Sequence, residues 1–66
     1  MIIKLNGRDE TIPRVKTLAD LVSRKNLSPE RVVIEHNCAI VHKDDLGKIF
    51  LRENDAIEII SFIGGG

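Results

Sequence analysis

Apolar and polar residues alternate at both ends of this chain, as they do in strands that bury one face and expose the other. The alternation predicts a first strand over residues 1–5 and a last strand over residues 56–63. In the last strand, Ile57 and Ile59 would face the core. The opposite face of that strand then carries Glu58, Ile60 and Phe62.

The dipeptide Asn6-Gly7 follows the first strand and is a strong hairpin signal, because both central positions of a type I′ turn need a positive φ. Residues 8–12 would return as the second strand. Pro13 ends that strand, since proline cannot donate a hydrogen bond to a neighbouring strand.

The middle of the chain predicts one short helix. Thr17 is a good N-cap, and Asp20 stands three positions later, which is a variant of the capping box. Apolar residues then recur at helical spacing. The helix is expected to stop near Asn26 or Leu27, because the following Pro29 disfavours helical backbone before it.

The stretch after the helix predicts two more strands. Residues 31–37 are expected to form the third strand, with Val33 and Glu35 facing water. Asn37-Cys38 stands where a turn is needed, and residues 39–42 resemble a short return strand. Residues 43–48 are expected to form a loop or a single helical turn. Residues 52–55 are expected to form a turn before the last strand.

The predicted order is strand, strand, helix, strand, strand, strand, in a single domain spanning residues 1–66. One helix lying across a mixed sheet of four to five strands is the economical layered arrangement, with the first and last strands parallel at its centre. This is the α+β fold called the β-grasp, or ubiquitin-like, fold. Residues 63–66 are expected to form a mobile C-terminal tail.

Composition narrows the range of functions. Ten basic and ten acidic residues cancel and are interspersed, and aromatic residues make up 3% of the chain, so nucleic-acid binding is not expected. No apolar stretch reaches the roughly 20 residues that cross a bilayer, and no signal peptide is evident. One cysteine gives no internal disulfide. A cytoplasmic protein is expected.

The last three residues, Gly64, Gly65 and Gly66, follow an apolar strand directly. Glycine loses much backbone entropy on ordering, so it is a poor choice for mere structural termination. It suits a thread that carries a terminal carboxylate through a narrow channel of another protein. The sequence therefore predicts that the reactive group is the carboxylate of Gly66. The alternative is a truncated linker or a cloning remnant.

Several short stretches resemble the ThiS family, the sulfur carrier proteins of thiamine biosynthesis. Together they cover nearly the whole chain: Ile3-Lys4-Leu5-Asn6-Gly7, Thr17-Leu18-Ala19-Asp20-Leu21-Val22, Val33-Ile34-Glu35-His36-Asn37 with Ile40-Val41, and Asp55-Ala56-Ile57-Glu58-Ile59-Ile60 leading to the glycines. Two positions depart from the family pattern, because Cys38 and Asn54 stand where glycine is usual. Asn54 can take a left-handed conformation. Cys38 does so less easily, which predicts another turn type or a longer loop there.

The resemblance implies a carrier rather than an enzyme. No cofactor and no metal are expected, because the sequence has no cofactor fingerprint and no zinc-type ligand spacing. An E1-like adenylating enzyme of the ThiF type would use ATP to adenylate the terminal carboxylate. A sulfur donor such as a cysteine desulfurase would then convert it to a thiocarboxylate. The sulfur would pass to a thiazole synthase of the ThiG type.

The globular part would need a surface by which partners hold it. Phe62 and Ile60, with Ile63, Val33 and Ile2, are expected to form an exposed apolar patch beside the tail that docks both enzymes in turn. The alternative is that the last strand is covered on both faces and these side chains are core.

Other candidate groups have simpler interpretations. Cys38 is expected to be a partly buried bystander rather than a nucleophile. His36 and His42 are interpreted as surface histidines, because their spacing is not that of a zinc site. Asp44 and Asp45 are expected in an exposed polar loop. Glu58 and Glu35 are assigned to the solvated face, with contact to a basic partner as the alternative.

Two further functions remain open from the sequence. One is a related carrier, such as the small subunit of molybdopterin synthase or a ubiquitin-like protein modifier. The other is a passive β-grasp interaction module with an irrelevant tail.

Overall fold

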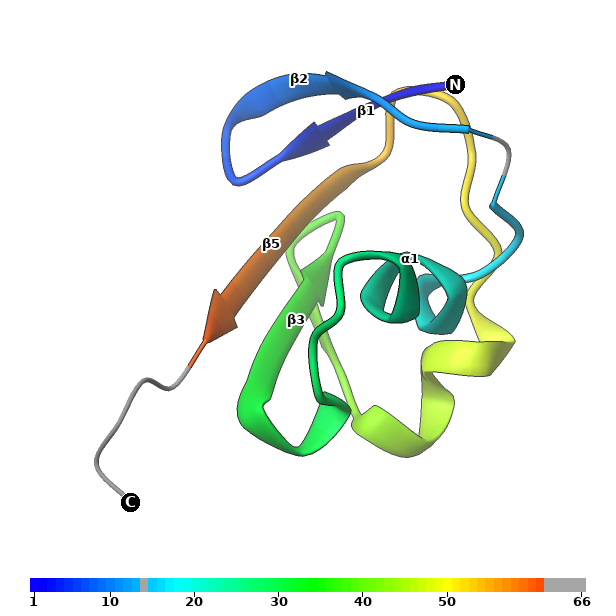
Figure 1. Cartoon of the computed structure of the whole chain (residues 1–66). Helices are drawn as coiled ribbons and strands as arrows, with labels where there is room; N and C mark the ends of the chain where they lie inside the picture. The colour runs from blue at the N-terminus through cyan, green and yellow to red at the C-terminus, as the bar shows by residue number, and fades with distance from the viewer. Residues whose placement is uncertain (14, 62–66) are drawn as a thin grey trace.

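The computed structural model describes residues 1–13 and 15–61 of the 66-residue chain (Figure 1). Five strands, one α-helix and two short 3₁₀ helices follow one another. In chain order they are β1 Ile2–Leu5, β2 Arg8–Thr11, α1 Leu18–Arg24, η1 Pro29–Arg31, β3 Val32–His36, β4 Ala39–Val41, η2 Lys43–Lys48 and β5 Ala56–Ser61. The predicted order of strands and helix is confirmed, and the polar stretch 43–48 forms the 3₁₀ helix η2.

The strands form one sheet in the order β2-β1-β5-β3-β4. The pairing of β1 with β5 is parallel, and Lys4 lies beside Ala56 in its register. The other neighbouring pairs are antiparallel. The last strand of the chain therefore lies at the centre of the sheet, between β1 and β3, as the β-grasp prediction requires.

Helix α1 packs on one face of the sheet, and Figure 1 shows α1 and η2 on the same side of β5 and β3. The core combines strand, helix and loop residues that are almost fully buried: Ile3, Ile12, Leu18, Leu21, Val22, Ile34, Leu46, Leu51 and Ile57. An ion pair between Lys25 and Glu10 also ties the end of α1 to β2. Among the described residues, no helix covers the opposite sheet face, which we call the outer face.

The start of α1 is as predicted. The Thr17 side chain accepts a hydrogen bond from the Asp20 N–H, and the Asp20 carboxylate accepts one from the Thr17 N–H, at 3.2 and 3.0 Å. This reciprocal capping box satisfies two of the free donors at the helix start. The hydrogen bond from the Thr17 N–H leads the causes that hold the pKa of Asp20 below its usual value.

The helix ends earlier than Pro29 suggested. Asn26 takes a left-handed conformation with φ of 59°. The N–H of Leu27 then bonds to the carbonyl of Val22 at 3.1 Å, and the N–H of Asn26 to the carbonyl of Ser23 at 3.0 Å. These two bonds are those of a Schellman motif, which closes a helix before any proline is needed.

Within residues 1–13 and 15–61, no helix has the length and apolarity that crossing a membrane would require.

Both hairpins use two-residue turns. Asn6 and Gly7 have φ of 53° and 82°, as a type I′ turn requires. Asn37 and Cys38 have φ of 50° and 74°, and they also connect directly paired strand ends. The prediction that Cys38 would force another turn type or a longer loop was wrong, because this cysteine adopts the left-handed conformation itself.

Candidate functional site

Strand β5 is the element that leads to the terminal glycines, and it ends at Ser61. Residues 62–66 lie outside the part of the chain that the structure describes. The predicted roles of Gly64, Gly65 and Gly66 in threading, and of Phe62 and Ile63 in docking, fall on these residues. The described part of the site is therefore the strand that presents the tail and the surface around its end.

The side chain of Asn6 holds β5 beyond the end of β1. Its Oδ1 accepts a hydrogen bond from the N–H of Ile59 at 2.7 Å, and its Nδ2 donates to the carbonyl of Ile59 at 3.2 Å. The backbone N–H of Asn6 donates to the carbonyl of Ile57 at 2.9 Å. One turn residue thus continues the pairing where β1 has already ended at Leu5.

The side chain of Asn37 does the same at the other end of β5. Its Oδ1 accepts from the N–H of Ala56 at 2.9 Å, and its backbone N–H donates to the carbonyl of Ala56 at 2.8 Å. Sequence reasoning assigned these asparagines to turns and missed their contacts with β5. The available signal was the recurrence of asparagine at the first position of both hairpin turns.

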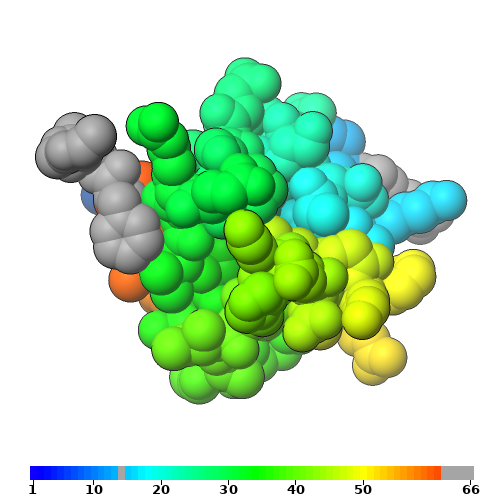
Figure 2. Space-filling model, turned by 90° about the horizontal axis from the view of Figure 1, so that it is seen from below, coloured from blue at the N-terminus to red at the C-terminus, as the bar shows by residue number. Residues whose placement is uncertain are grey.

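An apolar surface lies beside the end of β5, on the outer face. Ile60 is 51% exposed, and the register places it directly opposite Val33 of β3. Figure 2 shows the orange atoms of β5 next to the green atoms of β3, on the side of the molecule away from α1. The two described members of the predicted patch, Ile60 and Val33, are therefore adjacent.

Ile2 does not belong to this surface, contrary to the prediction. The parallel register aligns Lys4 with Ala56, so Ile2 lies before the first residue of β5, at the far end of that strand from Ile60. Ile2 is 43% exposed, on the outer face but away from the tail. The prediction grouped Ile2 with Ile60 because alternation along a strand shows which face a side chain occupies. Alternation does not show how far apart two residues lie along the sheet.

Two carboxylates stand next to Ile60 and Val33. Glu35 and Glu58 are directly opposite each other in the pairing of β3 with β5. Ile40 of β4 is opposite Glu35 on its other side and is 73% exposed. The predicted assignment of Glu35 and Glu58 to the solvated face is confirmed by this register and by the exposure of Glu58.

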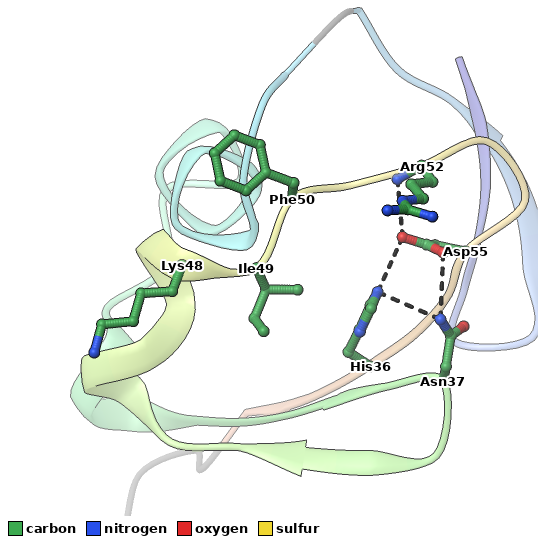
Figure 3. Close-up of a pocket in the computed structure, with 7 residues that line it drawn as sticks. All are labelled: His36, Asn37, Lys48, Ile49, Phe50, Arg52 and Asp55. Carbon is green, nitrogen blue, oxygen red and sulfur yellow. Dashed lines mark hydrogen bonds and ion pairs between the residues drawn. The ribbon is translucent and has the colours of Figure 1, made fainter.

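A polar cluster lies at the opposite end of β5 from the tail (Figure 3). The Asp55 carboxylate contacts His36 Nε2 at 2.9 Å and accepts hydrogen bonds from the N–H of Arg52 at 2.9 Å and from Asn37 Nδ2 at 3.3 Å. The Asp55 side chain is 10% exposed and that of His36 is 21% exposed. The interpretation of His36 as a surface histidine was therefore wrong, since its ring is mostly covered and bound to an acid.

The surroundings of Asp55 stabilise its ionised form. Burial alone would raise the pKa of this carboxyl group, but the hydrogen bonds from His36, the Arg52 backbone and Asn37 outweigh burial and hold the pKa below its usual value. An ionised acid with several donors is a stable structural anchor. It joins the turn after β3 to the loop before β5.

A hollow of about 390 Å³ opens beside this cluster, lined by His36, Asn37, Lys48, Ile49, Phe50, Arg52 and Asp55. In Figure 3 the Lys48 ammonium group and the Phe50 ring point away from the hydrogen-bonded groups rather than toward a common centre. Asp55 is already bonded to three donors. This arrangement suits holding the loop in place better than binding a ligand.

The remaining candidate residues lie on the surface, outside the hydrogen-bonded cluster around Asp55. Cys38 is exposed at the turn, so the expected partial burial was wrong. His42 accepts a hydrogen bond from the N–H of Asp44 at 3.1 Å and lies on the surface, as predicted. Asp45 contacts Lys48 at 3.4 Å within η2.

Comparison with known proteins identifies the family. The ThiS family model matches residues 3–66. A thiazole synthase from Magnetococcus marinus is 39% identical over 66 residues, which are 100% of this chain and 20% of that protein. The sulfur carrier protein ThiS of Bacillus subtilis is 33% identical over 66 residues, which are 98% of this chain and 100% of that protein.

A solved structure agrees with both sequence matches. The crystal structure of thiamine biosynthesis protein ThiS from Geobacter metallireducens superposes with a TM-score of 0.81 at 25% identity, over 100% of each chain. This chain spans about a fifth of the length of the thiazole synthases it matches, but the whole length of the Bacillus carrier. The chain belongs to the ThiS family.

Proposed function

We propose that this ThiS-family sulfur carrier of thiamine biosynthesis bears its sulfur as a thiocarboxylate on Gly66 and serves as a co-substrate of other enzymes. The observation that carries the proposal is the family match, which continues from β1 through the three terminal glycines at residues 64–66. The central position of β5 supports it, because the strand that leads to these glycines is bonded on both sides.

The terminal carboxylate needs activation before sulfur can be added. A carboxylate is ionised at neutral pH and resists nucleophiles. Transfer of AMP from ATP releases pyrophosphate and makes a mixed anhydride, in which AMP is a good leaving group. A sulfur donor then displaces AMP, and one oxygen of the original carboxylate leaves with AMP. Hydrosulfide gives the thiocarboxylate directly, whereas a cysteine persulfide gives an acyl disulfide, which a thiol must reduce to release the thiocarboxylate and form a disulfide. The absence of Cβ atoms in Gly65 and Gly66 keeps the thread narrow enough for close, oriented approach.

Three kinds of partner follow from this chemistry. An E1-like adenylating enzyme of the ThiF type would activate the carboxylate with ATP, and a donor such as a cysteine desulfurase would supply the sulfur. A thiazole synthase of the ThiG type would receive the sulfur. The similarity between this chain and a segment of two thiazole synthases supports the last of these partners.

The apolar surface of Ile60 and Val33 is proposed to dock these enzymes in turn, extended by Phe62 and Ile63 at the start of the tail. Exposed apolar groups beside a reactive terminus favour a transient protein contact. The protein is proposed to act as one domain in the cytoplasm, where the thiamine-pathway enzymes would meet it.

Intact-mass measurement tests the proposal. After incubation with an adenylating enzyme of the ThiF type, ATP and a sulfur source, the expected mass gain equals replacement of one oxygen by sulfur, with the change located on Gly66 by fragmentation. A variant lacking Gly65 and Gly66 is the control and should show no gain. A thiazole-requiring strain that still grows on this truncated variant would overturn the proposal. Rescue of a strain deficient only in molybdenum cofactor would assign the carrier to that pathway instead.

A further inference from the structure

Two glutamates lie side by side in the middle of the outer face of the sheet. Glu35 and Glu58 are direct cross-strand neighbours on β3 and β5. Like charges in this position repel each other and destabilise a sheet. Among residues 1–13 and 15–61, no lysine, arginine or histidine lies within ion-pair distance of either carboxylate.

The charge balance of the described strands on this face is acidic. Lys4 supplies the basic group there, and it already lies 4.0 Å from Asp9 on β2. Three carboxylates, Asp9, Glu35 and Glu58, thus face one lysine.

Apolar side chains border the acidic pair on two sides. Ile60 and Val33 form the next row toward the tail, and Ile40 lies beside Glu35 at the edge strand β4. Ile60 and Ile40 are 51% and 73% exposed. A charged centre with an apolar border is a pattern that a complementary protein surface can cover while excluding water.

We propose that Glu35 and Glu58 together bind one arginine on the surface of the enzyme that activates the tail, while aliphatic groups around that arginine pack on Ile60, Val33 and Ile40. This inference rests on the proposed function. Arginine fits because its planar guanidinium group offers several donors to two carboxylates at once. The pair would guide association electrostatically and fix the orientation of the carrier, so that the tail enters the active site in the correct direction.

The test compares wild-type protein with the Glu35→Gln/Glu58→Gln double variant, in binding to the adenylating enzyme by calorimetry and in sulfur loading by intact mass. The double variant should bind at least about tenfold more weakly, which is near the lower limit measured for close interfacial charge pairs. Its association rate should also depend less on salt than that of the wild type. Because the variant removes like-charge repulsion in the free carrier, its unfolding midpoint in urea should be equal or higher.

The matched control is Asp44→Asn, which removes one negative charge from η2 in the helix layer and should leave binding unchanged. Unchanged affinity of the double variant, with loading intact, would overturn the arginine contact and leave the proposed function standing. Lower stability of the double variant would show a structural role for the pair and overturn it too. Self-association of the wild type that the double variant loses would assign the face to a second copy of this chain. Failure of the wild type to be loaded would remove the proposed function and this inference together.

Discussion

Asp55 shows how one side chain can hold several segments together. It accepts hydrogen bonds from the backbone of Arg52 and from the side chain of Asn37, and it contacts His36. The segments joined are the loop before β5, the β3–β4 turn and the end of β3. No sequence pattern pairs residues 36 and 55, because that pairing follows from the antiparallel register of β3 and β5. The sequence could place Asp55 at a turn but not identify its partners.

Replacing Asp55 by asparagine should lower the free energy of unfolding by about 1–3 kcal/mol at pH 7. The reason is that the His36 ring, the Asn37 amide and the Arg52 N–H lose a charged acceptor. The pKa of Asp55 is lowered in the folded protein, so its stabilisation is fully present above the unfolded pKa of about 4 and is lost as pH falls through the folded pKa. The difference between wild type and variant should therefore shrink below about pH 4. Urea unfolding across this range measures it, with Asp44→Asn as an exposed control. A difference independent of pH would contradict the assignment.

Among the elements, the turns depend on asparagine. The non-glycine residues with positive φ in the described chain are Asn6, Asn26, Asn37, Cys38 and Asn54. Asparagine enters this region more readily than other side chains, and here it also supplies hydrogen bonds that glycine could not make. Asn6 bonds to Ile59, and Asn37 bonds to Ala56. The turns could be predicted from this preference, but the side-chain contacts depend on the neighbouring strand and could not.

In the two described hairpin turns, Cys38 takes a positive φ without the side-chain hydrogen bonds that Asn6 and Asn37 make. A φ of 74° costs a residue with a Cβ about 1–2 kcal/mol. Replacement by glycine removes this strain, but part of the gain is lost because glycine has more conformational freedom in the unfolded state. Cys38→Gly should therefore stabilise the protein by about 0.5–1 kcal/mol, seen as a higher urea midpoint with an unchanged slope.

Gly7→Ala is the matched control for that prediction. Gly7 has φ of 82°, and a Cβ added there would meet no atom within 4 Å. The Gly7→Ala variant should lose about 1 kcal/mol of unfolding free energy, and this loss would report backbone strain alone. A Cys38→Gly variant less stable than wild type would show that the cysteine side chain contributes a contact outweighing its strain.

For the whole molecule, the periodicity of apolar residues together with the cap and turn signals was enough to predict the fold. Alternation at both ends of the chain, a capped helical stretch and two turn signals leave few layered arrangements, and the structure has the expected central pair of β1 and β5. Distances along strands were not available from the same pattern. Val33 was placed correctly beside Ile60. Ile2 was placed wrongly, because the pattern gave its face but not its position along the sheet. A candidate site made of residues from several strands needs the register as well as the face.

In the proposed function, the folded domain presents the tail and the terminal carboxylate reacts. A change at the C-terminus should therefore alter the rate of adenylation without altering the stability of the fold. Adding one phenylalanine after Gly66 should lower the rate of adenylation by at least about 100-fold, because the reacting carboxylate is displaced and the thread is widened. The unfolding free energy should not change, since the described core ends at β5. Pyrophosphate release with the adenylating enzyme measures the rate. Adding one glycine is the matched control, because it moves the carboxylate without adding bulk. Unchanged adenylation of the phenylalanine variant would show that Gly66 is not the activated residue, whatever the fold.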